Sequence, residues 1–345
     1  MYQRCMVMGG GGGRLAAYLG MHEAACDAGL APDLVIGTCG GALAAALVHA
    51  EPDPARQRAW LSSPELYHFW AGFRAAPNAT LSRAVTGAAA RWLDPRRAAR
   101  VPQLHRGALF EAPPTWPALS WRRTGDTPHA VLLGARMLYG PGSAGQPRAG
   151  RKLFELVAMC QPDVASRVGK AAAALGGPAW PDSTIDNHLA VRSDIALMDA
   201  VRISFTDMFY LNAVSLRNEH FMGGVADLLP VELATQWAHK VWIERKAPAA
   251  CMHTSAWRHV LGISAPQRLR VVDSMPVALR IDTRVLARAL PRQLIEKRVQ
   301  LRANRLSLQA CTSEAEYQQL VDTHWHEGYR LMQALLDDPR TRAVA

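Results

Sequence analysis

Two glycine-rich turns, each between a short apolar run and a helical segment, dominate the first fifty residues. Residues 5–8 and 33–36 predict short buried strands, and residues 15–28 and 42–50 predict the helices that follow them. Strand, helix, strand, helix at this spacing is typical of a parallel sheet with crossover helices. The sequence therefore predicts an α/β protein.

Beyond residue 50 the patterns are weaker. Residues 51–186 carry scattered tryptophans among arginines, prolines and alanines without a sustained period of two, and we interpret them as a largely helical insertion or cap within one domain spanning residues 1–345. Periodicity and composition predict further helices at residues 64–74, 153–174, 195–205 and 230–234, and strands at residues 241–243 and 271–272. A capping-box pattern from Ser313 to Glu316 predicts a long C-terminal helix.

Composition limits the compartment and the cofactors. No apolar run reaches the roughly 18–20 residues of a membrane-spanning helix, and the N-terminal segment lacks the features of a signal peptide. The six cysteines are scattered without a C-x-x-C pair, which argues against a zinc site and a disulfide framework. We expect a cytoplasmic protein that uses no metal or other cofactor.

The net charge of +10 is concentrated in one part of the chain. Residues 240–305 contain fourteen Lys and Arg against four acids. A basic face can attract anionic lipid headgroups, so peripheral contact with an anionic membrane is one expectation. A uniformly arginine-rich surface without a partner is the other. Nucleic acid is the least favoured partner, because no aromatic residues interleave with these charges and no nucleic-acid motif is present.

The second glycine-rich turn carries the main candidate for chemistry. Residues 37–41 read Gly-Thr-Cys-Gly-Gly between a predicted strand and a predicted helix, which is the G-x-S-x-G shape of a nucleophile elbow with Cys39 in place of serine. Such a turn is sharp and its backbone passes close to neighbouring chain, so it needs small residues such as Gly37 and Gly41. The amides at the start of the next helix can stabilise a thiolate. Taken alone, the pattern also fits a buried cysteine that acts as a small apolar residue.

The first glycine-rich turn, residues 9–13 followed by Arg14, leaves backbone amides available to an anion. A phosphate-binding P-loop is excluded because its Gly-Lys-Ser/Thr ending is absent, and no frame fits G-x-G-x-x-G. An oxyanion hole for acyl transfer is the better interpretation. A flexible glycine turn is the alternative.

Taken together, three ordered blocks resemble the patatin-like lipid acyl hydrolases. Residues 10–14 with Gly20 and residues 28–33 are similar to that family's N-terminal block, and residues 37–42 to its elbow. Residues 221–232 are similar to its D-G-G-x-x-D-N-x-P segment. The resemblance implies a three-layer α/β/α sandwich and an apolar pocket for a fatty acyl chain. It also implies an oxyanion hole built by Gly11, Gly12 and Gly13, with Arg14 bracing that loop.

Both catalytic positions depart from the family's Ser–Asp dyad. Cys39 stands at the serine position and Met222 at the aspartate position, so ordinary Ser–Asp hydrolysis is excluded. A thiolate near a helix terminus can be populated without a base, but water attacking a thioester still needs one. His220, two residues before Met222 in an extended segment, would share its face and is the candidate base. A surface histidine in a turn is the other interpretation of His220.

The sequence therefore predicts a lipid acyl hydrolase or an acyltransferase that forms a thioester on Cys39, with a fatty acyl ester or thioester as substrate. The alternative is a pseudoenzyme that keeps the fold to bind an acyl chain or a protein partner. His324 and His326 do not indicate a metal, because two residues apart on a helix they point in opposite directions.

Overall fold

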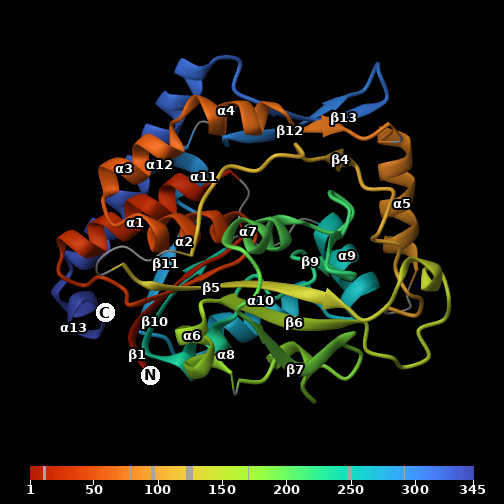
Figure 1. Cartoon of the computed structure of the whole chain (residues 1–345), viewed down its shortest axis with the longest axis horizontal. Coiled ribbons are helices and arrows are strands. Elements are labelled where there is room, and N and C mark those ends of the chain that lie inside the picture. Colours follow the sequence, from red (N-terminus) through yellow and green to blue (C-terminus); the bar gives the residue numbers. More distant parts are fainter. Residues whose placement is uncertain are drawn as a thin grey trace.

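The computed structural model describes residues 1–10, 13–77, 79–94, 98–121, 127–169, 171–246, 251–290 and 292–345, and of residues 251–253 only the backbone. A mixed sheet of mostly parallel strands forms its centre (Figure 1). The strand order is β11-β10-β1-β2-β5-β6-β7. The bounds of these strands, in that order, are Leu279–Asp282, Ala238–Arg245, Tyr2–Met8, Leu34–Gly37, His129–Met137, Phe154–Cys160 and Ile185–Arg192.

The five strands from β11 to β5 run parallel, so their carboxyl ends meet at one edge of the sheet. Strand β6 is antiparallel to β5 and parallel to β7. A hairpin of β8 (Val214–Leu216) and β9 (Glu219–Met222) adds to β5 from the same side as β2. On β5, the last residue that pairs with β2 is Leu132, and Ala135 pairs with β9. The end of β9 therefore lies close to the end of β2.

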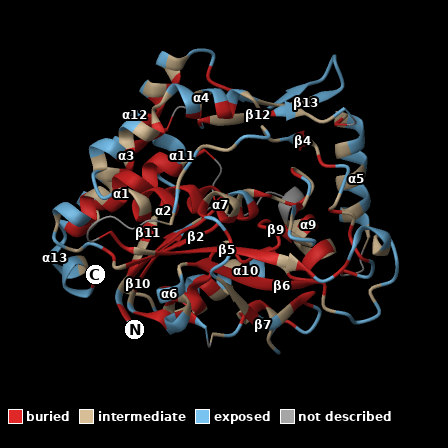
Figure 2. Ribbon diagram, in the orientation of Figure 1, coloured by how far each residue is buried: buried red, intermediate tan, exposed pale blue. Residues whose placement is uncertain are grey.

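Helices cover both faces of the sheet and build two separate apolar cores, which confirms the three-layer α/β/α fold (Figure 2). One face carries α1 and α2, which follow β1 and β2, together with α7 and the outer helices α3, α4 and α12. Their bounds are Leu15–Asp27, Gly40–Ala50, Leu197–Phe205, Pro54–Leu61, Pro64–Ala71 and Glu314–Leu336. The opposite face carries α6, α8, α9 and α10. Their bounds are Pro162–Val168, Val231–Trp237, Cys251–Leu261 and Ala265–Ser274.

The long helix α12 begins where the capping box predicts, because the Ser313 hydroxyl accepts a hydrogen bond from the Glu316 amide at 3.2 Å. It crosses α1 at very short range. A Cβ on Gly20 would lie 2.0 Å from the Trp325 carbonyl oxygen. Glycine at this crossing lets the two backbones touch, and α12 then holds α1 against the sheet. The short helices α11 (Leu286–Ala289) and α13 (Pro339–Val344) flank α12.

A rim of less buried elements stands above the carboxyl edge of the sheet (Figures 1 and 2). It consists of α5 (Leu81–Leu93), the antiparallel hairpin of β12 (Ile295–Gln300) and β13 (Arg305–Ala310), and the small β3–β4 pair of Arg74–Ala75 and Phe110–Glu111. The start of α5 is tied to the hairpin turn, because the Leu81 amide donates to the Asn304 carbonyl at 2.9 Å.

Two predicted elements are wrong, and a third prediction is wrong in part. Residues 153–174 contain strand β6 and the short helix α6 instead of one helix. The run Phe154–Cys160 is buried on both faces, and such a run shows no strand period. Residues 271–272 belong to α10 rather than to a strand. Residues 51–186 include the helices α3 to α6, but they also supply β5 and β6 to the central sheet, so they are not only an insertion or cap.

None of the described helices combines the length and the apolar composition needed to cross a bilayer.

Candidate active site

Cys39 lies at the sharp turn between β2 and α2, at the carboxyl edge of the sheet. Its φ of 51° and ψ of −125° are unusual for a residue with a side chain. Such backbone strain costs of order 1–3 kcal/mol and persists where the surrounding structure enforces it. The turn packs so closely against the end of β1 that a Cβ on Gly41 would lie 2.0 Å from the Met8 carbonyl oxygen. It is also so sharp that a Cβ on Gly37 would lie 2.6 Å from Cα of Ala42. The backbone therefore has the conformation of a nucleophile elbow.

Contacts from three other segments fix this elbow. The Cys39 amide donates a hydrogen bond to the Ser204 hydroxyl near the end of α7, at 3.0 Å. The Thr38 hydroxyl donates to the Leu228 carbonyl at 3.0 Å, and the Thr38 amide donates to the Met8 carbonyl at 3.0 Å. The elbow is thus held by β1, by α7 and by the segment after β9. The half-buried Cys39 side chain is left facing a cavity.

Part of the first glycine-rich turn lies beside Cys39. Gly10 lies beside the sulfur, since a Cβ there would be 3.6 Å from Cys39 Sγ. Gly11 and Gly12, two of the predicted oxyanion-hole residues, lie outside the described residues. Gly13 packs against the chain before β12, where a Cβ would lie 2.7 Å from the Leu294 amide nitrogen. Arg14 lines the cavity and makes no ion pair with the carboxylates that the structure describes, so its side chain is a cation of the cavity wall.

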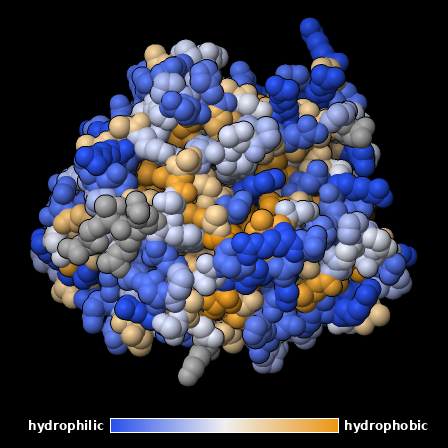
Figure 3. Space-filling view, viewed as in Figure 1, coloured by the Kyte–Doolittle hydropathy of each residue, from blue (hydrophilic) through white to orange (hydrophobic). Residues whose placement is uncertain are grey.

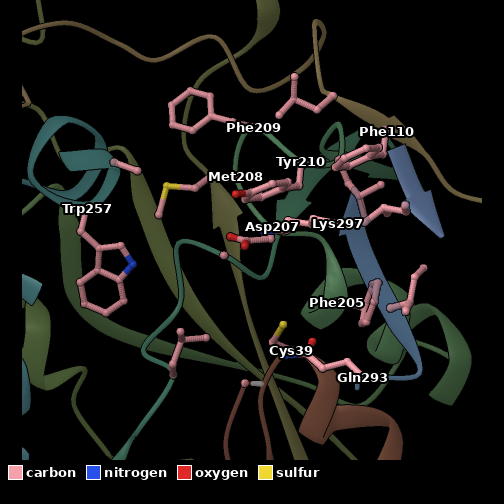
Figure 4. Close-up of a pocket in the computed structure, with 18 of the residues that line it drawn as sticks. Cys39, Phe110, Phe205, Asp207, Met208, Phe209, Tyr210, Trp257, Gln293 and Lys297 are labelled. Atoms are coloured by element: carbon pink, nitrogen blue, oxygen red, sulfur yellow. The ribbon is translucent and has the colours of Figure 1, made fainter. Parts of the chain in front are cut away.

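The cavity in front of Cys39 has a volume of about 1320 Å³ (Figure 4). Much of its wall is aromatic or aliphatic, and on the face shown in Figure 3 apolar side chains gather at a hollowed centre surrounded by hydrophilic ones. The apolar wall includes Phe73, Phe110, Phe205, Met208, Phe209, Leu211, Trp257 and Leu290. A volume and lining of this kind suit a ligand with a long apolar chain.

The polar part of the wall is strongly basic. Ten Lys or Arg side chains line the cavity, against the four acids Asp207, Asp227, Glu244 and Glu296. Five of the ten pair with carboxylates: Lys246, Arg268, Arg284, Arg292 and Arg298. The other five make no ion pair with a carboxylate in the described parts of the chain: Arg14, Arg83, Arg91, Arg106 and Lys297. The cavity therefore carries a surplus of positive charge.

Aromatic side chains hold two of these cations. The Lys297 ammonium lies 3.6 Å from the ring centroid of Tyr210, which in turn stacks on Phe110 at 6.0 Å. The Arg91 guanidinium lies 4.2 Å from the ring centroid of Phe209, and burial lowers its pKa. Cation–π contacts of this kind fix the position of a charge without neutralising it.

Two buried polar networks brace the strand ends under the cavity. The Tyr18 hydroxyl lies 2.6 Å from Oε1 of Glu244 and 2.8 Å from the Gly9 carbonyl. Burial, and then the charge of Glu244, hold the pKa of Tyr18 well above its usual value. Asp227 pairs with the buried Arg268 at 2.6 Å and accepts the Leu229 amide at 3.2 Å. Burial raises the pKa of Asp227 despite the opposing charge of Arg268. These contacts suit bracing roles for Asp227 and Glu244.

Met222 and His220 do not lie where a dyad would need them. The Met222 side chain is fully buried in the apolar core on the α8–α10 face, and it is not among the described residues that line the cavity. His220 is also absent from that lining. Its Nδ1 lies 3.0 Å from the Ser215 hydroxyl, and its ring packs against His105 at 4.5 Å between centroids. The structure therefore does not bring His220 together with Cys39.

Asp207, which the sequence patterns did not single out, points into the cavity that Cys39 faces (Figure 4). It lies two residues beyond the end of α7 and in none of the three blocks that resemble the known family. An acidic residue after a helix carries no motif by itself. Only the fold shows that α7 ends at the elbow, where the Ser204 hydroxyl accepts the Cys39 amide.

No group of three or more His, Cys, Asp or Glu side chains in the described part of the chain could hold a metal ion. His324 is buried, with its Nε2 atom 2.7 Å from the Arg292 carbonyl oxygen, whereas His326 is exposed. The two histidine side chains therefore point to different surroundings, as their spacing of two residues on a helix predicts.

A strained elbow at the end of a parallel strand, opening onto a large apolar cavity, defines an α/β protein of the nucleophile-elbow class. A family model for patatin-like phospholipase matches residues 6–235, about two thirds of the sequence. The chain belongs to the patatin-like phospholipase family, and the match includes residues 51–186, for which the sequence patterns indicated no relationship. The family associates the chain with lipid acyl hydrolase activity. No curated protein matches the chain.

Proposed function

We propose that the protein is a lipid acyl hydrolase or acyltransferase that forms an acyl-thioester on Cys39. The observation that carries this proposal is the elbow itself. Cys39 is held at φ 51° in the tight turn between Gly37 and Gly41, and its sulfur faces a cavity large enough for a lipid chain. A cysteine that only filled space in the core would not need a strained backbone or access to a cavity.

The first step is acyl transfer to sulfur. The start of α2 places its positive dipole end at Cys39, which favours the thiolate. The thiolate attacks the acyl carbonyl carbon, the C–S bond forms, and the bond to the leaving alcohol or thiol breaks as that group takes a proton. The Gly40 amide follows the nucleophile and is the position from which an elbow supplies an oxyanion-hole donor. Gly11, Gly12 and Gly13 remain the proposed source of further amides.

The cavity favours an acyl compound with an anionic group. The apolar wall suits the acyl chain, and the five cations that make no ion pair with a described carboxylate suit a phosphate or another anion. Four of these cations, Arg83, Arg91, Arg106 and Lys297, come from α5, the loop before β4 and strand β12. An anionic phospholipid and a phosphate-bearing acyl thioester share this chemistry.

The rim formed by α5 and the β12–β13 hairpin is the proposed contact with an anionic membrane. Helix α5 has no buried residue, and Val85, Ala88, Ala89 and Trp92 form an apolar stripe along it at i, i+3, i+4 and i+7. Trp92 is 60% exposed, and Leu301 at the hairpin turn is 77% exposed. Arg298, Arg302 and Arg305 flank that turn. Apolar and basic side chains in this combination are typical of surfaces that bind lipid headgroups.

A single labelling experiment tests the catalytic proposal. The protein is incubated with p-nitrophenyl dodecanoate, quenched in acid and analysed by peptide mass spectrometry. We expect one dodecanoyl group on Cys39, removable by hydroxylamine at neutral pH because it is a thioester. Cys26→Ala is the matched control, since it removes an exposed thiol and should leave the adduct unchanged. Absence of the adduct in a folded protein would defeat the proposal.

The pseudoenzyme alternative is favoured by one observation. Met222, at the position of the family's catalytic aspartate, is fully buried in an apolar core and supplies no proton acceptor. A pseudoenzyme would bind dodecanoate or a phospholipid without any covalent adduct. Binding with no labelled Cys39 in the same experiment would therefore identify it.

A further inference from the structure

Helix α5 presents basic residues to the cavity and apolar residues to solvent. Arg83, Gly87 and Arg91, which share one face of the helix at i, i+4 and i+8, line the cavity. Val85 and Trp92 lie on the other side of the helix and are exposed. A surface helix of a globular protein normally does the reverse, with its apolar face buried and its charges in water. The arrangement of α5 therefore suits an anion on the cavity side.

Arg91 is the more buried of the two arginines. Its guanidinium lies 4.2 Å from the Phe209 ring centroid, and its Nη1 atom lies 3.4 Å from where a Cβ on Gly87 would stand. In the described parts of the chain, its Nε atom is buried without a hydrogen-bond partner. Burial lowers the pKa of Arg91, although the nearby Tyr210 opposes that shift. A desolvated donor of this kind is costly unless a ligand supplies an acceptor.

The next residue along the chain holds a second cation. The Lys297 ammonium of β12 lies 3.6 Å from the Tyr210 ring centroid, and it makes no ion pair with a carboxylate in the described ranges. Because Phe209 and Tyr210 are consecutive, one dipeptide receives a cation from α5 and another from β12. In Figure 4 Phe209, Tyr210 and Lys297 lie together toward one end of the cavity, and Cys39 lies toward the other.

The backbone of this dipeptide is strained and firmly held. Phe209 has a φ of 68°, which a bulky residue rarely adopts. The Leu109 amide donates to the Phe209 carbonyl, and the Phe110 amide donates to the Tyr210 carbonyl, both at 2.9 Å. Strain of this kind persists only where the surrounding structure enforces it, and it clusters at ligand-binding sites. The strained turn directs both rings to the cavity wall, where each positions one cation.

We propose that Arg91 and Lys297, held on the Phe209–Tyr210 pair, form a binding site for a phosphate group of the acyl substrate. This inference rests on the proposed function, because it takes the acyl group to lie at Cys39. A guanidinium fork and an ammonium together suit phosphate. A lipid phosphomonoester and an acyl-coenzyme A both carry that group. The family match ends before β12 begins, so family membership does not account for the lysine.

Calorimetric titration with decyl phosphate and with decanol tests the site without requiring turnover. We expect the wild-type protein to bind decyl phosphate on the order of 100-fold more tightly than decanol. In Lys297→Gln and in Arg91→Gln this preference should fall about tenfold, while decanol binds as before because the apolar wall is intact. Lys297→Arg should keep most of the preference. Lys240→Gln is the matched control, since it removes the same charge from a part of β10 that does not line the cavity.

Three results would overturn the inference. Equal affinity for the two ligands in the wild-type protein would show that no phosphate site exists. An equal loss of preference in Lys240→Gln would show only the effect of overall charge. A parallel loss of decanol affinity in Lys297→Gln and Arg91→Gln would show a structural role. The proposed function fails separately, because a protein that binds decyl phosphate as expected but never acylates Cys39 would keep the site and lose the chemistry.

The source of the phosphate is identified in Cys39→Ala, which cannot form the thioester. Inorganic phosphate, dodecanoyl lysophosphatidic acid and dodecanoyl-coenzyme A are titrated into this variant and into the same variant with Lys297→Gln. The acyl ligand whose affinity falls about tenfold in the double variant is the substrate class that the site binds. A fall for inorganic phosphate alone would assign the site to a free anion and would overturn its role in substrate binding.

Discussion

The elbow and the rim face the same cavity but are built in opposite ways. At the elbow every residue from Gly40 to His49 is buried, and backbone atoms approach so closely that Gly41 has no room for a Cβ. On the rim, α5 has no buried residue and keeps Trp92 exposed. Tight packing fixes the position of a nucleophile, whereas an exposed apolar and basic surface needs a partner to cover it. The contrast supports the two proposals, that Cys39 at the elbow is the nucleophile and that the rim contacts an anionic membrane.

The largest expected effect comes from filling the elbow. In Gly41→Ala the new Cβ would lie 2.0 Å from the Met8 carbonyl oxygen, so β1 and α2 must separate. We expect a loss of about 3 kcal/mol in the free energy of unfolding, together with loss of Cys39 acylation. Chemical denaturation and the labelling assay measure the two effects. Gly140→Ala is the control, because no atom lies within 4 Å of its Cβ position. Equal stability of both variants would show that the elbow is looser than described.

The contrast also explains what the sequence could predict. The elbow and its flanking elements follow from local signals, namely short apolar runs, glycines and helices that begin at once. Strand β6 was predicted as a helix, because a run buried on both faces has no alternation to mark it as a strand. The mismatch at Met222 was visible in the sequence. Asp207 was not, since its place depends on how α7 ends against the elbow, and such long-range contacts leave no local pattern.

An intermediate effect is expected on the rim. Replacing the exposed Trp92 by Ala removes apolar surface that would enter the lipid headgroup region, and we expect about tenfold weaker binding to anionic vesicles, or ~1.4 kcal/mol. Binding by the wild-type protein should also weaken as salt is raised. Acylation by soluble p-nitrophenyl butyrate should not change, because the elbow is untouched. Vesicle co-sedimentation measures the binding.

Val344→Ala provides the control for the rim. Val344 is 53% exposed, close to the exposure of Trp92, but it lies on α13 at the other end of the molecule (Figure 1). It should bind vesicles as the wild-type protein does. Equal losses in the two variants would mean that no particular face docks, and equal binding to neutral and anionic vesicles would remove the electrostatic part of the proposal.

The smallest effect is expected at His220. The histidine was the base that the sequence favoured, but its ring packs on His105 and its Nδ1 atom lies at the Ser215 hydroxyl, away from the cavity. In His220→Gln the amide can still form a hydrogen bond with Ser215, so the local structure should persist. We expect turnover of p-nitrophenyl dodecanoate within about twofold of the wild-type rate, well short of the roughly 10²-fold cost of losing a general base. A loss of that size with normal acylation would instead identify His220 as the base.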